Sequence, residues 1–286
     1  MTDALICKEA MQYDPIKRSL GRVFNATPGF RVLFYRLLNL LLLRSWYIRR
    51  ELKKWASLQG SQASILDAGS GFGQYSWSMS RLGAGYRILG VDVKEEQVAD
   101  CNWFFETLGK GDRVTFKTAD LTIFDEPESY DLILSVDVME HIEEDRKVFH
   151  NFFSSMAPGG MLLISTPSDK GGSDAHEHGE EGISGFIDEH VRDGYNMDDI
   201  REKLEEAGFS EVDCRYSYGK PGHISWLLSM KFPITMLNKS KLFFVLLPFY
   251  YLVFWPLAAV LNRMDISMQH KEGTGLIVKA HKPMQK

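Results

Sequence analysis

Cysteine is scarce in this sequence of 286 residues, which contains only Cys7, Cys101 and Cys214. Three scattered thiols form neither a disulfide framework nor a paired metal motif, so they favour a reducing, cytosolic setting. The first fifteen residues lack the apolar core of a secretion signal. The chain also shows no internal repeat and no low-complexity tract. These absences predict an ordinary globular protein of the cytosol.

Positive charge is sparse in the middle of the chain. Residues 55–219 contain 13 Lys/Arg and 32 Asp/Glu, whereas residues 17–54 contain ten Lys/Arg and one acid, and residues 220–272 six and two. The acidic middle argues against a nucleic acid partner. The two basic segments are also the most apolar ones, and that combination is typical of proteins at an anionic membrane surface.

Short apolar runs alternate with helical patterns through the acidic segment. This alternation predicts a largely parallel sheet with helices on both faces, whose ligands bind at the carboxyl ends of the strands. The predicted strands cover 64–68, 87–92, 113–120, 130–137, 161–166, 211–218 and 275–282, and the predicted helices 74–82, 94–108, 145–156 and 196–209.

The first predicted strand runs into ILDAGSGFGQY, a glycine-rich loop. Its pattern is D-x-G-x-G-x-G, with Asp67, Gly69, Gly71 and Gly73. Glycines let the backbone turn tightly and approach a ligand closely. A dinucleotide fingerprint would need a third glycine where this chain has Gln74.

Two more acids follow on the next strands. Asp92 ends the second strand, where a carboxylate can accept hydrogen bonds from both hydroxyls of a ribose. Ala119 and Asp120 end the third strand, where they can contact an adenine amino group. The loop and these acids together predict a nucleoside-binding site.

This arrangement resembles class I S-adenosylmethionine-dependent methyltransferases over most of residues 62–219 and the last strand. The segments DLILSVDVMEHIEED and APGGMLLIST are similar to the ubiquinone-pathway O-methyltransferases. The resemblance implies an α/β, Rossmann-like fold with a seven-stranded sheet whose last strand is antiparallel, and S-adenosylmethionine as the cofactor. The implied cofactor-binding residues are Asp67, Gly69, Gly71, Gly73, Asp92, Asp120 and Leu121.

The end of the fourth strand carries D-x-x-E-H, formed by Asp137, Glu140 and His141. In the family that the chain resembles, this spacing has been associated with a divalent metal, which could polarise a hydroxyl acceptor. The alternative is that Glu140 and His141 cap and orient a helix without a metal, which we favour. We expect Asp137, Glu140 and His141 to be catalytic, and the metal remains an open hypothesis.

A polar stretch, 167–195, is long for a loop and predicts a lid over the acceptor. Its His176-Glu177-His178 matches no specific metal motif. Its DEHVRDGY resembles the E-H-x-R-x-[FY] segment of many small-molecule and lipid methyltransferases. This resemblance implies that His190 is a catalytic base and that Arg192 and Tyr195 bind the substrate, or that His190 and Arg192 tie the lid to the core. Tyr75, just after the glycine loop, is a further candidate for contact with cofactor or acceptor.

Residues 242–261, LFFVLLPFYYLVFWPLAAVL, carry no charge. A helix of this length measures about 30 Å, roughly the hydrocarbon thickness of a bilayer. However, the run lies between two strands of one sheet, so a single crossing would leave the last strand on the wrong side. Residues 224–238 are too short and too polar to supply a second crossing. The sequence therefore predicts an apolar hairpin, kinked at Pro248 and Pro256, that enters one leaflet.

The cations around this run would meet lipid headgroups. They are Lys231, Lys239, Lys241 and Arg263. The alternatives for the run are a buried cap and a dimer interface. Exposure of so many aromatic and aliphatic side chains would otherwise promote aggregation.

The N-terminal segment has helical periodicity with a basic face. On one helix, an uncharged stripe would comprise Phe34, Leu37, Leu41, Ile48, Leu52 and Trp55, and the arginines and lysines would lie away from it. Such a helix can lie in a membrane interface or pack on the domain, and the sequence does not decide between them.

The expected organisation is a basic helical region (1–60), a methyltransferase domain (61–219 with 273–286) and an apolar insertion (220–272). The expected function is a methyltransferase that acts on a lipophilic or lipid-linked acceptor at the cytoplasmic face of a membrane, as a peripheral or monotopic protein. Two alternatives remain: a soluble small-molecule methyltransferase that dimerises through the insertion, and a membrane-tethered nucleoside-binding scaffold without turnover.

Overall fold

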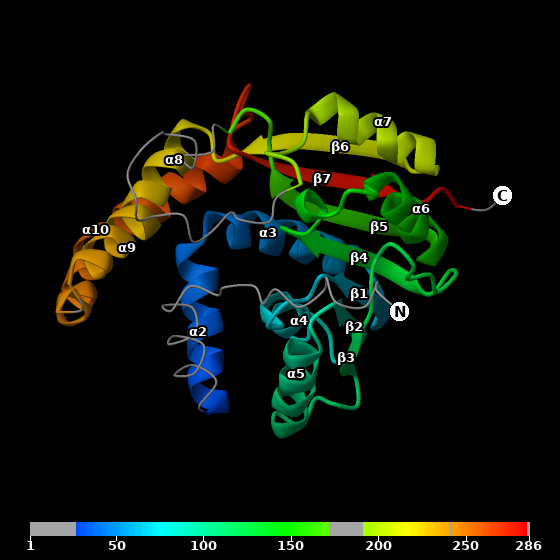
Figure 1. Cartoon of the computed structure of the whole chain (residues 1–286), viewed down its shortest axis with the longest axis horizontal. Coiled ribbons are helices and arrows are strands. Elements are labelled where there is room, and N and C mark those ends of the chain that lie inside the picture. The colour runs from blue at the N-terminus through cyan, green and yellow to red at the C-terminus, as the bar shows by residue number, and fades with distance from the viewer. Residues whose placement is uncertain (1–26, 172–190, 241, 285–286) are drawn as a thin grey trace, which may run out of the picture.

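The computed structural model describes residues 27–171, 191–240 and 242–284. A seven-stranded sheet forms the centre of the protein, with the strand order β3-β2-β1-β4-β5-β7-β6 (Figure 1). β7 pairs antiparallel with both β5 and β6, and the other pairs are parallel. The strands are β1 (Gln62–Ala68), β2 (Gly85–Asp92), β3 (Val114–Thr118), β4 (Tyr130–Val136), β5 (Met156–Pro167), β6 (Ser210–Ser217) and β7 (Gly275–His281). This topology confirms the predicted sheet and its antiparallel last strand.

Helices cover both faces of the sheet, and each face has its own apolar core. Ile65 of β1 packs in one core and the next residue, Leu66, in the other, because successive side chains of a strand point to opposite faces. The first core includes side chains of α3 (Leu43–Leu58), α4 (Gln74–Met79) and α5 (Glu95–Thr107). The second includes side chains of α6 (Asp145–Ser155) and α7 (Met197–Ala207).

All seven strands differ from their predicted bounds by at least one residue, and the differences in β5 and β3 affect the fold and the site. β5 begins at Met156 rather than at residue 161, because residues 156–160 continue in extended conformation past an irregularity in the β4–β5 register. β3 ends at Thr118, so Ala119 and Asp120 lie in the loop that follows.

The N-terminal segment is two helices rather than the single one that the stripe requires. α2 (Pro28–Leu41) ends at Leu42, whose φ of −85° and ψ of 114° are extended, and α3 starts at once after it. The predicted stripe is therefore wrong as a continuous surface. Its C-terminal part, Ile48, Leu52 and Trp55, is buried in the core, while Leu37 is exposed. Packing on the domain thus accounts for α3 but not for the apolar side of α2.

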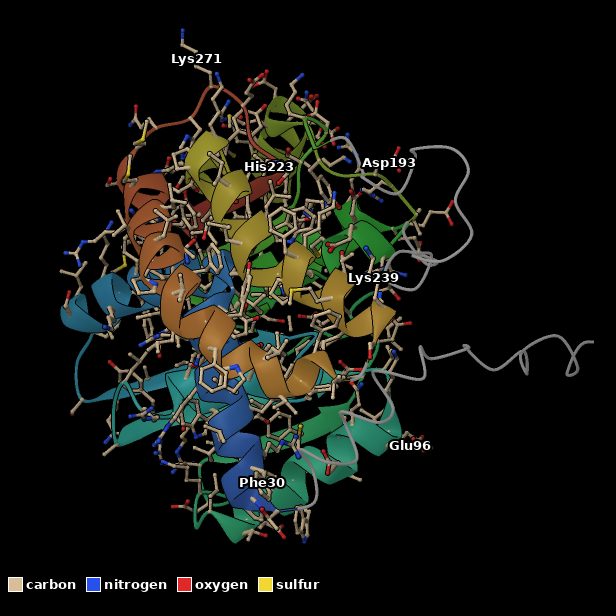
Figure 2. The ribbon with its side chains drawn as sticks, turned by 90° about the vertical axis from the view of Figure 1, so that its left-hand side faces the viewer. Phe30, Glu96, Asp193, His223, Lys239 and Lys271 are labelled. Atoms are coloured by element: carbon tan, nitrogen blue, oxygen red, sulfur yellow. The ribbon has the colours of Figure 1, made fainter. Side chains whose placement is uncertain are left out.

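The insertion between β6 and β7 is a helical hairpin, hereafter the hairpin. One arm comprises α8 (Lys220–Trp226), the π-helical turn η2 (Leu227–Lys231) and α9 (Phe232–Lys239), and the other is α10 (Phe243–Ser267). Figures 1 and 2 show the two arms side by side, projecting from the domain. The chain reverses near Ser240, so the prediction of a hairpin kinked at its own prolines is wrong. Pro248 and Pro256 lie inside the single helix α10.

Hydrogen bonds join α10 to the other arm, residues 220–239, which is the less apolar of the two. Tyr250 and Tyr251 donate their hydroxyls to the carbonyls of Leu228 (2.8 Å) and Ser229 (2.9 Å), and Ser225 donates to the carbonyl of Ala258 (3.1 Å). Leu228 and Ser229 belong to the π-helical turn, and Pro233, four residues after Ser229, has no N–H to donate to the Ser229 carbonyl.

A buried acid joins the hairpin to the domain. Asp265, near the end of α10, is fully buried and accepts hydrogen bonds from the Tyr47 hydroxyl (2.8 Å), Tyr218 N (3.1 Å) and Gly222 N (2.9 Å). These donors belong to α3, to the residue after β6 and to α8. The base of the hairpin is therefore part of the core, and only its far part projects.

Candidate active site

Three glycines shape the loop between β1 and α4. Gly69, Gly71 and Gly73 have φ values of +78°, +51° and +79°, a region that residues with a side chain rarely adopt. At Gly69 a Cβ atom would lie 2.2 Å from Cγ2 of Val138. The loop after β1 can therefore approach the end of β4 only with glycine at this position.

A carboxylate from the neighbouring strand holds this loop. Asp92 is the last residue of β2 and accepts hydrogen bonds from Gly71 N (2.9 Å) and Lys94 N (3.0 Å). Asp120 accepts from Thr122 N (2.8 Å) and closes a turn, with its neighbour Leu121 buried. The structure thus brings the predicted cofactor residues of three adjacent strands to one edge of the sheet. Their contacts with a cofactor remain a prediction.

The loop also has a hydroxyl whose hydrogen-bonding capacity is unused. Ser70 Oγ is buried and has no partner among the residues that the structure describes. A buried polar atom is normally hydrogen-bonded, so such an atom beside glycines and a carboxylate fits a polar ligand. These features match a nucleoside cofactor, for which Asp92 would accept hydrogen bonds from ribose hydroxyls.

Asp67, the first acid of the motif, lies beneath the loop rather than facing solvent. It is 2% exposed and accepts a hydrogen bond of 2.5 Å from Ser76 Oγ. Burial raises the pKa of its carboxyl to about 6, an effect that the Ser76 hydrogen bonds reduce and the charge of Asp92 reinforces. Asp67 therefore positions the start of α4 against β1.

The raised pKa of Asp67 predicts a pH-dependent stability. In the unfolded chain the carboxyl loses its proton near its ordinary pKa of 3.8, whereas the folded protein keeps it up to about 6. The folded state thus binds more protons between these values, so this contribution to stability is present below pH 3.8 and is lost as the pH rises to about 6. The loss amounts to about 3 kcal/mol at 1.36 kcal/mol per pKa unit.

We expect Asp67→Asn to remove this dependence. Urea unfolding at intervals from pH 4 to pH 7 should show the wild-type protein losing about 2 kcal/mol relative to the variant, because part of the contribution is already lost at pH 4. If the free energy of unfolding depends on pH in the same way in both proteins across this range, Asp67 is not the group responsible.

On the acceptor side, the structure brings the D-x-x-E-H residues beside the glycine loop. Asp137 has a φ of +53°, an uncommon conformation for a residue with a side chain, and forms an ion pair with Arg44. Glu140 is 1% exposed and accepts a hydrogen bond of 3.0 Å from Thr166 Oγ1. Burial raises the pKa of Glu140. His141 is exposed at the end of the short turn η1 (Met139–His141).

Arg44 and Tyr218 are the site residues that sequence reasoning missed. Arg44, in the first turn of α3, pairs with Asp137 through its guanidinium and donates its backbone N–H to the Tyr218 hydroxyl (3.0 Å). Its Nε is buried without a partner among the described residues. The hydroxyl of Tyr75, a predicted substrate residue on α4, lies 3.4 Å from Oγ of Ser45, which follows Arg44 in α3. For Arg44, the only signal in the sequence was its positive charge, which suggests contact with lipid as readily as an ion pair.

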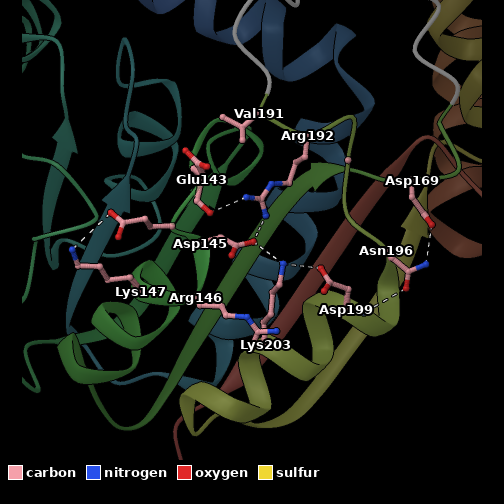
Figure 3. Close-up of a pocket in the computed structure, with 12 residues that line it drawn as sticks. Glu143, Asp145, Arg146, Lys147, Asp169, Val191, Arg192, Asn196, Asp199 and Lys203 are labelled. Atoms are coloured by element: carbon pink, nitrogen blue, oxygen red, sulfur yellow. Dashed lines mark hydrogen bonds and ion pairs between the residues drawn. The ribbon is translucent and has the colours of Figure 1, made fainter.

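Arg192 lies in a separate polar cluster between α6 and α7 (Figure 3), and its guanidinium contacts Tyr195. Arg192 pairs with Asp145 and donates to the Tyr195 hydroxyl (2.8 Å) and the carbonyl of Ile142 (2.7 Å). Tyr195 is 1% exposed and donates to Asp145 (2.8 Å). Arg192 and Asp145 line an open cavity of about 790 Å³, whereas Tyr195 lies outside its lining. These contacts tie the segment after residue 190 to the core, and substrate binding by Arg192 and Tyr195 remains a prediction.

The remaining predictions on this side are not all described by the structure. His190 and the His176-Glu177-His178 triplet lie outside the described residues. No group of three or more His, Cys, Asp or Glu suited to a metal occurs within the described ranges. Asp137, which the metal hypothesis needs as a ligand, is paired with Arg44 instead.

Comparison with known proteins identifies a family. The profile of a methyltransferase domain matches residues 43–213, which include α3. Phosphoethanolamine N-methyltransferase 1 of Triticum aestivum is 30% identical over 152 residues, covering 52% of this chain and 28% of that protein. Ubiquinone biosynthesis O-methyltransferase of Cupriavidus pinatubonensis is 30% identical over 113 residues, covering 39% and 43%.

Solved structures share the fold at low sequence identity. Phosphoethanolamine N-methyltransferase 2 of Haemonchus contortus, in complex with phosphomonomethylethanolamine and S-adenosylhomocysteine, matches with a TM-score of 0.60 and 18% identity over 93% of this chain and 60% of that one. The cyclase SpnF matches with a TM-score of 0.55 and 17% identity over 83% and 81%. The chain spans less than half the length of the Triticum aestivum and Cupriavidus pinatubonensis relatives. The two solved structures that share the fold are named as a methyltransferase and as a cyclase.

Proposed function

Since this chain belongs to the methyltransferase domain family, we propose that it transfers the methyl group of S-adenosylmethionine to a lipophilic or lipid-linked acceptor at the cytoplasmic face of a membrane. The class I S-adenosylmethionine-dependent methyltransferase domain accounts for the sheet, the glycine loop and the cofactor. The hairpin and the N-terminal helices are the parts that the proposal assigns to membrane and acceptor.

The exposed apolar surface of α10 carries the membrane part of the proposal. α10 is the one helix among the described residues that is long and apolar enough to cross a bilayer by length and composition. Within its most apolar stretch of 18 residues, only 6% is buried. Its most exposed large side chains are Val245, Phe249, Leu252 and Val253, each at least 65% exposed. An apolar helix of this kind in water favours association with a lipid phase.

The hairpin geometry supports docking on one leaflet rather than crossing. α10 leads back into β7, and its last turns are fixed in the core through Asp265. Exposed Lys231 and Lys239 lie on the other arm, where they can meet lipid headgroups. A groove between the arms, of about 480 Å³, is lined mainly by apolar side chains, among them Leu228, Phe232 and Phe254.

The chemistry requires the acceptor atom to be aligned behind the sulfonium methyl group that the cofactor supplies. Positioning in a site without bulk water contributes most to such a displacement. Asp92 and the glycine loop would orient the cofactor. Arg44 fixes the Asp137 carboxylate, which with Glu140 would bind the acceptor. His141, or His190 beyond the described residues, would accept the proton that the acceptor loses.

The relatives narrow the acceptor only in part. One is named for phosphoethanolamine and one for the ubiquinone pathway. A hydroxyl or an amine linked to an apolar chain agrees with both and with the hairpin. The D-x-x-E-H resemblance to the ubiquinone-pathway enzymes favours a hydroxyl.

A partition experiment tests this function. The purified protein is incubated with cofactor labelled on its transferable methyl and with a total membrane extract, after which organic and aqueous phases are separated. We expect the label in the organic phase, and none with boiled protein. Label confined to the aqueous phase would indicate a soluble acceptor and favour a dimer through the hairpin. No transfer in either phase, with cofactor bound but unconsumed, would favour a scaffold.

A further inference from the structure

α2 has its polar side inside and its apolar side outside. With 100° per residue, the buried Arg31, Tyr35 and Asn39 lie on one side of the helix. Exposed apolar side chains occupy the opposite side, namely Phe30, Leu33, Leu37 and Leu40, which are 51%, 46%, 39% and 39% exposed. We call these four the outer face of α2. A surface helix of a soluble protein normally has the reverse arrangement.

The buried polar side of α2 is bonded to the glycine loop. Arg31 is 1% exposed and donates to Asp100 (2.6 Å) and to the carbonyl of Phe72 (2.8 Å), the residue between Gly71 and Gly73. The Tyr35 hydroxyl donates to the same Phe72 carbonyl. The Phe72 ring packs 5.9 Å from the rings of both Phe34 and Tyr35. The position of α2 therefore helps to set the position of the loop.

The outer face of α2 and the hairpin lie on the same side of the molecule. Figure 2, viewed from that side, shows Phe30 of α2 and Lys239 at the end of α9 both toward the viewer, with α10 in front. Figure 1 shows the two elements projecting from the same end of the domain. Exposed cations accompany both apolar surfaces, Arg36 on α2 and Lys231 and Lys239 on the hairpin. Apolar surface flanked by cations complements an anionic lipid surface.

We infer that the outer face of α2 is a second membrane-docking surface, and that lipid contact through it steadies the cofactor loop. The occupant is a bilayer that contains anionic lipid. The inference rests on the proposed membrane function and extends it, because docking would then strengthen cofactor binding as well as bring the acceptor close. Residues 1–26 and a second copy of the chain are other possible occupants, and the experiment distinguishes them.

The first measurement is the depth of α2 in the bilayer. An environment-sensitive fluorophore is attached at Leu37→Cys, and at the exposed Glu202→Cys of α7 as control, in a chain whose Cys7 and Cys214 are replaced by serine. With vesicles containing 30% anionic lipid, we expect a blue shift and quenching by lipids brominated on their acyl chains for Leu37→Cys only. Vesicle binding without either change at Leu37→Cys would overturn the inference but leave the proposed function standing. An absence of vesicle binding would contradict both.

The second measurement is the coupling to the cofactor. We expect the same vesicles to lower the Kd for S-adenosylhomocysteine about threefold or more for the wild-type protein. In solution, the Leu33→Ser/Leu37→Ser variant should have the same Kd for S-adenosylhomocysteine as the wild-type protein. It should still bind vesicles through the hairpin, but the vesicles should no longer lower its Kd. Leu58→Ser/Ile123→Ser, which changes two exposed apolar side chains outside both surfaces, should behave as wild type.

Three further results would each overturn the inference. The first is an unchanged Kd in the wild-type protein with bound vesicles. The second is a vesicle effect that persists in the Leu33→Ser/Leu37→Ser variant. The third is a stable dimer in solution that only this variant dissociates. The same fluorescence change without vesicles, lost on removal of residues 1–26, would identify those residues as the occupant instead.

Discussion

Gly69→Ala should weaken binding of S-adenosylhomocysteine at least 100-fold, as measured by isothermal titration calorimetry. Two effects add at this position. A φ of +78° costs a residue with a side chain about 1–2 kcal/mol. The new methyl group would also lie 2.2 Å from Cγ2 of Val138, so either the loop or the end of β4 must move. The loop then no longer presents its backbone to the cofactor.

Two further variants separate the clash from the backbone strain. Gly71→Ala has the strain but no atom within 4 Å of its Cβ, so we expect a loss of about tenfold. Val138→Ala in the Gly69→Ala background removes the clashing methyl groups and should restore part of the affinity. Equal losses for Gly69→Ala and Gly71→Ala, with no rescue, would show that the contact with Val138 does not determine the loop. Thermal unfolding of each variant establishes that it is folded.

Phe249→Glu/Val253→Glu should reduce vesicle binding at least 100-fold. These side chains are 66% and 67% exposed, one turn apart on α10. Burial of a large apolar side chain stabilises by about 1.5–3 kcal/mol, so loss of two removes about 3 kcal/mol or more, and each tenfold in affinity corresponds to about 1.4 kcal/mol. The added carboxylates would also be repelled by anionic headgroups.

The measurement is co-flotation with vesicles that contain anionic lipid. Ile123→Glu changes an apolar side chain that is 75% exposed, on the loop after β3, and this variant should float as wild type does. Because the α10 side chains make few contacts within the protein, the melting temperature should stay within a few degrees. If the double variant floats as well as wild type, α10 is not the docking surface. If the wild-type protein is a dimer that the variant dissociates, the soluble alternative gains support.

The sequence alone was sufficient for features that depend on local backbone chemistry and on periodicity. The largely buried strands β1, β4, β5 and β7 follow from short apolar runs between turn signals, because a strand buried on both faces needs such a run. The glycine loop is readable because Gly69, Gly71 and Gly73 meet a conformational requirement of their own backbone. The class of fold and the edge of the sheet that bears the site could therefore be predicted.

Tertiary structure decided everything that depends on pairs of residues far apart in the chain. Charge alone did not reveal that Arg31 would be buried against Asp100 or that Arg44 would pair with Asp137. Helical periodicity did not show the break at Leu42, and composition did not show that residues 220–239 would pair with α10. The physical reason is that a side chain's propensity is a property of the residue, whereas its burial and its partner are properties of the packed molecule. Local sequence patterns were enough to identify the kind of domain, whereas the packing of the whole molecule set which apolar and charged side chains face outward.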